Sequence, residues 1–195
     1  MRNREHAGTR LCGVLLAAGI CLAASWANAG VVTFSALPGP NGTAFTTVTE
    51  DGITVASTSG AWQQGFNVGN PIPSIFTFSG TASVTVTTGG LFDFTSFDLG
   101  TGTGANFGPS YSAQEFVGAT LVASFSGSNP DNLFHTISDS FSGLVDRVVI
   151  TTTLGPSATS ANLDNIATAA VPEPATLALI ALGLAALGFS RRRKN

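Results

Sequence analysis

The order of hydrophobic and polar residues in the middle of the chain has the two-residue period of β-strands. Residues 81–87 read TASVTVT, so that Ala82, Val84 and Val86 lie on one face and hydroxyl side chains on the other. Further segments rich in Val, Ile, Thr and Phe cover residues 31–37, 44–49, 53–58, 75–79, 91–99, 116–125, 133–137, 144–153 and 162–168. No stretch of about 11 or more residues has a helical period. The pattern therefore predicts an all-β domain.

Turn residues separate these segments at short intervals. Glu50-Asp51-Gly52 is typical of a hairpin turn, and Gly89-Gly90 indicates a tight turn into the next strand. Residues 100–112, GTGTGANFGPSYS, form a glycine-rich loop, and residues 129–132 and 155–160 form shorter ones. Eight to ten short strands with turns about every 8–12 residues predict a β-sandwich that is jelly-roll-like.

One predicted strand changes phase along its length. In residues 91–99, Phe92 and Phe94 share one face, whereas Phe97 and Leu99 fall on the other. A strand can bury all four only if it contains an extra residue, so the sequence predicts a bulge or a bend at Thr95-Ser96.

The N-terminus has the organisation of a secretory signal peptide. Residues 1–10 carry three arginines, residues 11–24 are apolar, and Ala27 and Ala29 give the small-x-small pattern of a signal-peptidase site. We therefore expect residues 1–29 to be removed, leaving a body of residues 30–168. Both cysteines, Cys12 and Cys21, lie in the removed part, so the mature chain forms no disulfide.

The C-terminus has three parts in a fixed order. A linker at residues 169–174 includes Val171-Pro172-Glu173-Pro174, and residues 175–190 are almost entirely apolar. A basic tail at residues 191–195 contains Arg191, Arg192, Arg193 and Lys194. Fifteen apolar residues give about 22 Å of helix against a hydrocarbon core of about 30 Å, a mismatch that snorkelling arginines reduce. The sequence predicts one transmembrane helix with a cytoplasmic tail, because positive charge stays inside.

These residues carry a family resemblance. Val-Pro-Glu-Pro-Ala-Thr, a short apolar helix and a terminal arginine cluster resemble a PEP-CTERM sorting signal, found in proteins that Gram-negative bacteria export. The resemblance implies recognition by exosortase, a membrane-embedded cysteine protease-transpeptidase. It also implies processing near Pro172-Glu173-Pro174, after which the helix is discarded. It covers about an eighth of the chain and implies nothing about the activity of the body.

The charge of the body excludes two classes of partner. Residues 30–170 contain nine acidic residues and a single base, Arg147, which gives a net charge of −8. A domain with one cation cannot neutralise a run of phosphates, so nucleic-acid binding is excluded. Electrostatic docking on anionic lipid is excluded for the same reason.

The body offers no recognisable catalytic set, so we expect it not to be an enzyme. Nucleophilic catalysis needs a base beside the nucleophile, and the only histidine of the mature chain, His135, has the pattern of a strand residue. Two pairs of acids, Asp93 with Asp98 and Asp139 with Asp146, could in principle serve a glycosidase. We interpret them as surface carboxylates that keep the domain soluble.

Three residues are candidates for binding. Trp62, which lies among glutamines, and Tyr111 could stack on a sugar, although the favoured interpretation of Trp62 is a core residue with its N–H satisfied. Leu163-Asp164-Asn165-Ile166 resembles the last strand of many secreted jelly-roll domains, in some of which the aspartate helps to bind a structural calcium. Asp164 is thus a candidate calcium ligand or a strand-end hydrogen-bonding residue. Zinc lacks ligands, and we expect no other cofactor.

Together these features predict an exported protein of the cell surface or extracellular matrix. Its precursor is anchored in the membrane and is processed by signal peptidase and exosortase. The body is predicted to be a non-enzymatic structural or adhesive domain. The alternative is a carbohydrate-binding module, stabilised by calcium, whose partner is an exopolysaccharide.

Overall fold

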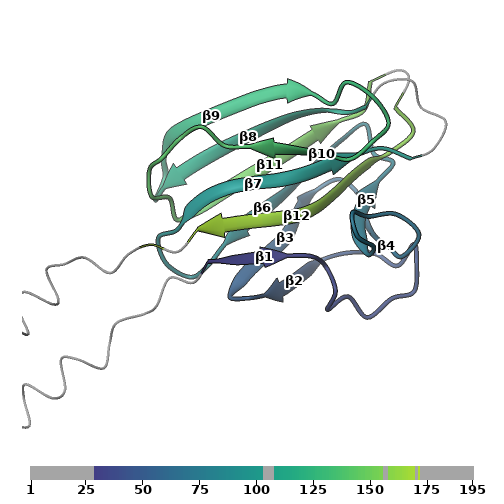
Figure 1. Cartoon of the computed structure of the whole chain (residues 1–195), viewed down its shortest axis with the longest axis horizontal. Coiled ribbons are helices and arrows are strands. Elements are labelled where there is room, and N and C mark those ends of the chain that lie inside the picture. Colours follow the sequence, from purple (N-terminus) through teal and green to yellow (C-terminus); the bar gives the residue numbers. More distant parts are fainter. Residues whose placement is uncertain (1–28, 103–107, 156–157, 170, 172–195) are drawn as a thin grey trace, which may run out of the picture. The chain divides into compact units, whose positions relative to one another are not determined.

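The computed structural model describes residues 29–102, 108–155, 158–169 and 171, which form the strands shown in Figure 1. The predicted transmembrane helix lies outside these residues. No helix in the described part of the chain is long and apolar enough to cross a membrane. The strands are β1 (Gly30–Val32), β2 (Thr47–Glu50), β3 (Ile53–Ser59), β4 (Trp62–Gly65), β5 (Ser74–Thr77), β6 (Thr81–Thr87), β7 (Asp93–Gly100), β8 (Ser110–Val117), β9 (Thr120–Ser128), β10 (His135–Ser138), β11 (Arg147–Thr153) and β12 (Ala161–Ala169).

The strands form two six-stranded antiparallel sheets, which confirms the predicted β-sandwich. The first sheet has the order β10-β7-β12-β5-β4, and β1 pairs with the C-terminal half of β12. The second has the order β2-β3-β6-β11-β8-β9. Neighbours such as β3 and β6, or β7 and β12, are distant in sequence, so the chain crosses repeatedly from one sheet to the other. We call these the first sheet and the second sheet below.

The inner faces of the two sheets share one hydrophobic core. Alternate residues of β6 and β11 point inward from the second sheet, as the two-residue period requires. The first sheet contributes large side chains from β7 and β12, and Trp62 from β4 lies between the sheets. The fully buried members include Phe34, Ile53, Val84, Phe92, Phe97, Leu99, Ile150, Leu163 and Ile166.

Two local sequence signals are confirmed. The turn between β2 and β3 contains Asp51 and Gly52, both with positive φ (49° and 77°), which is the backbone of a type I′ hairpin turn. In β7 the pairing with β12 skips Thr95, because Phe94 pairs with Thr168 and Ser96 pairs with Ala167. The predicted bulge at Thr95-Ser96 is therefore present.

A second bulge, which was not predicted, lies opposite in β12. Asp164 pairs with Asp98 and Ala167 with Ser96, so β12 has one residue more than β7 in this interval. Asn165 takes up the extra residue with φ of 44°, a left-handed conformation that asparagine tolerates better than most residues. As a result Leu163 and Ile166, three positions apart, both lie in the core.

Two expectations about strands were wrong. Residues 116–125 are not one strand: β8 ends at Val117, and β9 begins at Thr120 after a turn at Gly118, whose φ is 60°. The first three residues of β8 fall in the predicted glycine-rich loop at residues 100–112. The short strand β4 was also not expected, because Gly60 precedes it closely and Gly65 is its last residue.

The strand ends define two ends of the domain. At one end β1 begins and β12 ends, since Gly30 pairs with Thr168 and Asp93 pairs with Ala169. The β8–β9 turn lies at this same end, which is on the left in Figure 1. We call it the exit end, because the chain leaves the domain here toward residues 170–195. The opposite end, with the β9–β10 connection, is the far end.

Truncation of a core ring tests the assignment of the core. Phe97→Ala should lower the free energy of unfolding by about 3–5 kcal/mol, because Phe97 is fully buried and contacts rings from the other sheet. Leu133→Ala is the control, because Leu133 is 61% exposed and its removal should change stability by less than about 0.5 kcal/mol. Urea unfolding followed by tryptophan fluorescence measures both, and equal stabilities of the two variants would contradict the assignment.

Candidate functional site

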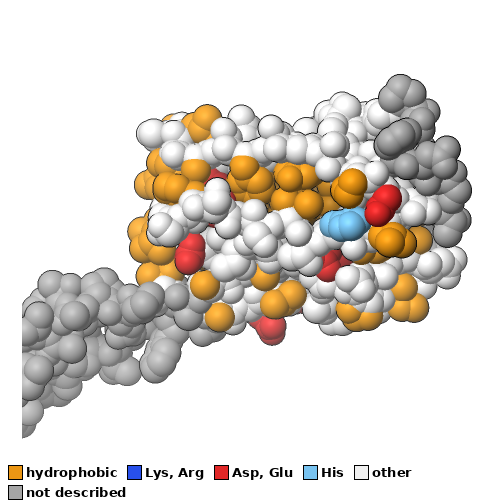
Figure 2. Space-filling view, turned by 45° about the horizontal axis from the view of Figure 1, so that its top comes forward, with side chains coloured by type: hydrophobic (Ala, Val, Ile, Leu, Met, Phe, Trp, Pro, Cys, Tyr) orange, Lys and Arg blue, Asp and Glu red, His pale blue; other side chains and the backbone are white. Residues whose placement is uncertain are grey.

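The most chemically varied region is the open side of the sandwich between the edge strands β9 and β10. These strands belong to different sheets and face each other across the domain. His135 and Ile137 of β10 pair with Leu99 and Phe97, so their side chains lie on the inner face. On the opposite sheet Phe125 points inward, because it pairs with buried Ala113. Figure 2 shows hydrophobic side chains along this side, with the histidine near one end.

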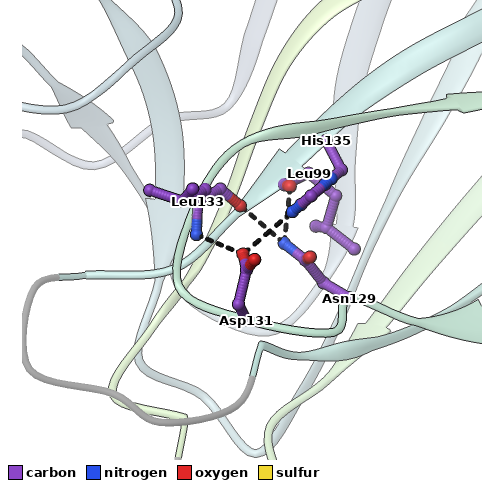
Figure 3. A network of polar contacts seen from close by, with 5 residues as sticks. All are labelled: Leu99, Asn129, Asp131, Leu133 and His135. Carbon is purple, nitrogen blue, oxygen red and sulfur yellow. Dashed lines mark hydrogen bonds and ion pairs between the residues drawn. The ribbon is translucent and has the colours of Figure 1, made fainter.

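At the far end of this side, a polar network fixes the loop that leads into β10 (Figure 3). Asn129 donates both hydrogens of its amide, to the carbonyls of Leu99 and Leu133, each at 2.8 Å. Asp131 Oδ1 accepts the N–H of Leu133 and lies 2.8 Å from His135 Nε2. These two contacts lower the pKa of Asp131, the backbone N–H contributing most. The partner of His135 is therefore a carboxylate that also holds the backbone of the loop before β10.

The middle of the open side is aromatic. Tyr111 meets Phe97 edge to face at a centroid distance of 5.6 Å, and Phe125 lies 6.3 Å from Tyr111. Such edge-on pairs stabilise a core and leave little ring face for a ligand. Tyr111 thus belongs to the boundary of the core, half-buried.

At the exit end of the open side, two carboxyl groups face each other inside the protein. Glu115 of β8 is fully buried on the inner face, and Asp139 follows β10. Among the described residues, neither oxygen of Glu115 nor Oδ2 of Asp139 has a hydrogen-bond donor. Burial raises the pKa of Glu115 from 4.5 to about 7, and the Asp139 carboxylate adds to this effect, with a smaller contribution from Asp93.

This pair can hold a proton. Two ionised carboxylates cannot bond to each other, whereas a carboxyl and a carboxylate share one hydrogen bond. Glu115 has no exposed surface, so the pair lies within the fold and not at the protein surface. The pairs considered in the sequence, Asp93 with Asp98 and Asp139 with Asp146, are not the pair that forms. The interpretation of Asp98 as a surface carboxylate is wrong, because Asp98 is 4% exposed.

Asp164 lies in a second polar cluster, on the outer face of the first sheet. Its Oδ2 accepts the N–H of Asn70 at 2.6 Å, and its Oδ1 accepts the N–H of Asn165 at 2.8 Å. Its neighbour Asp98 accepts hydrogen bonds from Thr136 Oγ1, at 2.6 Å, and from Asn165 Nδ2, at 2.8 Å. The cluster binds the loop before β5 to the sheet.

The geometry at Asp164 fits a hydrogen-bonding role better than a calcium site. Both oxygens already face N–H donors, whose partial positive charge would repel a cation. Burial raises the pKa of Asp164 to about 6, against the lowering effect of these two N–H groups. Within the described part of the chain no three His, Cys, Asp or Glu residues are placed to hold a metal ion.

The ligand-binding prediction for Trp62 gives way to the core interpretation. Its ring is 2% exposed, and its indole N–H donates to the carbonyl of Ser83 in the second sheet at 3.1 Å. A ring in this position has no face to offer a sugar. The neighbouring Gln64 is buried as well and accepts the N–H of Gly39.

The residues predicted to direct export lie largely outside the described structure. Ala29 and Val171 are described, and they flank β1 and β12. Ala27, the remaining residues of the Pro-Glu-Pro segment and the basic cluster Arg191, Arg192, Arg193 and Lys194 are not. For these residues the decisive observation comes from sequence comparison.

Residues 170–194 match the family model of the PEP-CTERM protein-sorting motif. The chain carries a PEP-CTERM sorting motif. The match contains Pro172, Glu173 and Pro174 and the apolar segment with its basic tail, as the resemblance implied. It begins directly after the last residue of β12, so the motif follows the β-domain with no additional domain between them.

Comparison with solved structures gives weak likenesses. The CBM32 of AlyQ, in complex with 4,5-unsaturated mannuronic acid, has a TM-score of 0.44 and 15% identity, over 64% of this chain and 96% of that one. The CBM22-1 xylan-binding domain of Paenibacillus barcinonensis Xyn10C has a TM-score of 0.42 and 9% identity, over 75% and 98%. The family 32 CBM of C. perfringens NanJ, in complex with galactose, has a TM-score of 0.39 and 20% identity, over 60% of this chain and 97% of that one. No curated protein matches the chain. At these TM-scores the likenesses carry no argument about ligand or activity.

Sequence reasoning missed Glu115. The burial of Glu115 could have been predicted from the alternation of Tyr111, Ala113 and Glu115, which places a glutamate on a face that is otherwise apolar. The glycine-rich composition just before it concealed this period, because it made residues 100–112 resemble a loop.

The pH dependence of stability tests the carboxyl pair. A carboxyl whose pKa is raised by folding stabilises the protein fully below its unfolded pKa, and this contribution is lost as the pH rises through the folded value. Between pH 4.5 and about 7 the free energy of unfolding should therefore fall by on the order of 2 kcal/mol because of Glu115. Glu115→Gln should flatten this part of the profile and stabilise the protein at pH 8.

The matched control is Asp51→Asn, which changes an exposed carboxyl in a hairpin turn and should keep the wild-type profile. Chemical unfolding at a series of pH values gives the data. Parallel profiles for Glu115→Gln and the wild type would show that Glu115 does not titrate in this range.

Proposed function

We propose that this protein is an exported β-domain that its PEP-CTERM motif retains at the membrane and delivers to the cell surface or extracellular matrix. There it acts as a structural or adhesive component and not as an enzyme. The observation that carries the proposal is the sorting motif at residues 170–194, which follows β12 directly. Exosortase and signal peptidase are the processing partners in this proposal.

The register of β1 supports export of the domain as a unit. The predicted signal-peptidase site lies after Ala29, so Gly30 becomes both the mature N-terminus and the first residue of a strand. Glycine suits this position because a Cβ atom here would lie 2.8 Å from the Cβ of Asp51. Gly30 pairs with Thr168, so both processing sites join the domain at its exit end. Cleavage at either site leaves the strands intact.

Variants of the motif test the sorting step. In cells that make exosortase, Glu173→Ala, and separately deletion of residues 191–194, should abolish C-terminal cleavage and leave the precursor in the membrane fraction or mislocalised. Asp51→Asn is the control and should be processed normally. Intact mass spectrometry of the membrane, surface and medium fractions reads out both cleavages. Unchanged cleavage and localisation in both motif variants would refute the proposal.

A second candidate function, carbohydrate binding, is favoured by one group of aromatic residues near the far end. Phe76 and Phe78 meet edge to face at 5.2 Å, and Phe78 is 64% exposed. Asn162 lies between β5 and β7, paired with Phe76 and with Gly100, and the ring of Phe134 covers that glycine. Asn162 is itself buried, so the exposed ring of Phe78 is the surface on which a sugar could stack.

Binding to polysaccharide tests this candidate. Full-length protein should be retarded in affinity electrophoresis by exopolysaccharide from the producing cells, and Phe78→Ala should remove most of the retardation. Leu133→Ala, also exposed and near the far end, is the control and should bind as the wild type does. Absence of retardation of the wild type, or equal retardation of all three proteins, would reject Phe78 as a carbohydrate-binding residue.

A further inference from the structure

Large hydrophobic side chains are exposed at the exit end of the domain. The β8–β9 turn presents Val117 and Leu121, and β9 continues with Val122. The connections before β7 and β11 present Leu91 and Leu144. Each of the five is between 40% and 48% exposed. We call them the apolar end patch, and Figure 2 shows hydrophobic side chains gathered at this end, on its left.

Backbone pairing brings the two halves of the patch together. The antiparallel bridge between Phe92 and Val145 places Leu91 opposite Asp146 and Leu144 opposite Asp93. The N–H of Asp146 donates to the carbonyl of Phe116 at 2.9 Å, which joins this bridge to the β8–β9 turn. The patch is therefore built by rigid strand ends and does not depend on a free loop.

The chain from the domain to its predicted membrane segment is short. β12 ends at Ala169, and the apolar run begins at Ala175, so residues 170–174 form the whole connection. Five residues span at most about 17 Å when fully extended. A precursor held in the bilayer by residues 175–190 thus has its exit end close to the lipid surface. This step rests on the membrane retention proposed above.

The charge at this end permits contact with neutral lipid. Arg147, the one base of the body, lies here with its guanidinium 4.4 Å from the ring centre of Phe116. The nearby turn at Asp51 is acidic and exposed. Electrostatic attraction to anionic lipid is therefore weak. The favourable free energy of membrane contact comes from burying apolar side chains in the lipid–water interface.

We propose that the apolar end patch rests on the surface of the bilayer in the membrane-retained precursor. The domain then stands with its far end outward, and the Pro-Glu-Pro segment is held at the interface where a membrane-embedded enzyme can reach it. The occupant of the patch is lipid, and a second copy of the chain is the competing outcome.

The experiment measures lipid contact in the precursor after signal-peptide removal, residues 30–195, which contains no cysteine. Single cysteines replace Leu121 or Leu144 in the patch, and a cysteine in place of Leu133 at the far end is the matched control. Each is labelled with a small environment-sensitive fluorophore and reconstituted into neutral phosphatidylcholine liposomes. Lipids with a shallow nitroxide quencher should remove most of the fluorescence at positions 121 and 144 and little at position 133. Two patch positions guard against misfolding of one variant.

The outcomes separate this inference from the proposed function. If the chain does not float with the liposomes, membrane retention fails, and this inference fails with it. If it floats but the quencher acts equally at both ends, only the docking of the patch is overturned. If the fluorescence of the patch labels is unaffected by the quencher but changes as the protein-to-lipid ratio is raised, the patch binds a second copy of the chain. That result also overturns the inference.

Discussion

The pairing of β12 with three other strands is the constraint on which the rest of this structure depends. β7 lies along one edge of β12, while β5 and then β1 share the other. The left-handed residue Asn165 lets the strand change phase, so that Leu163 and Ile166 both enter the core. Every strand of the first sheet is thereby placed, directly or through one neighbour, by the last strand before the sorting motif.

A domain with one base must stabilise its buried acids without salt bridges. Asp98 and Asp164 accept hydrogen bonds from amide N–H groups and a hydroxyl. Glu115 has no such donor in the described structure, and its raised pKa indicates that a proton serves instead. The scarcity of basic residues in the body therefore also determines how these buried carboxyls are satisfied.

The sequence predicted features that depend on near neighbours and missed those that depend on distant ones. The alternation of residues 81–87, the turn at Asp51-Gly52 and the bulge at Thr95 are local, and all three are present. The sequence could not show that Trp62 is covered by the opposite sheet, because that depends on a partner 21 residues away. The burial of Glu115 beside Asp139 depends in the same way on a pairing that local composition does not encode.

The connection of the tether to β12 has a mechanical consequence. Any pull on the membrane side enters the domain at Ala169, in a strand that has hydrogen-bonded neighbours on both edges. The force runs along the strand, so the ladders to β7, β5 and β1 are loaded together in shear and must break as a group. An edge strand would instead be peeled off one bond at a time. The C-terminal segment therefore leaves the domain from a strand that is paired on both edges and would be loaded in shear.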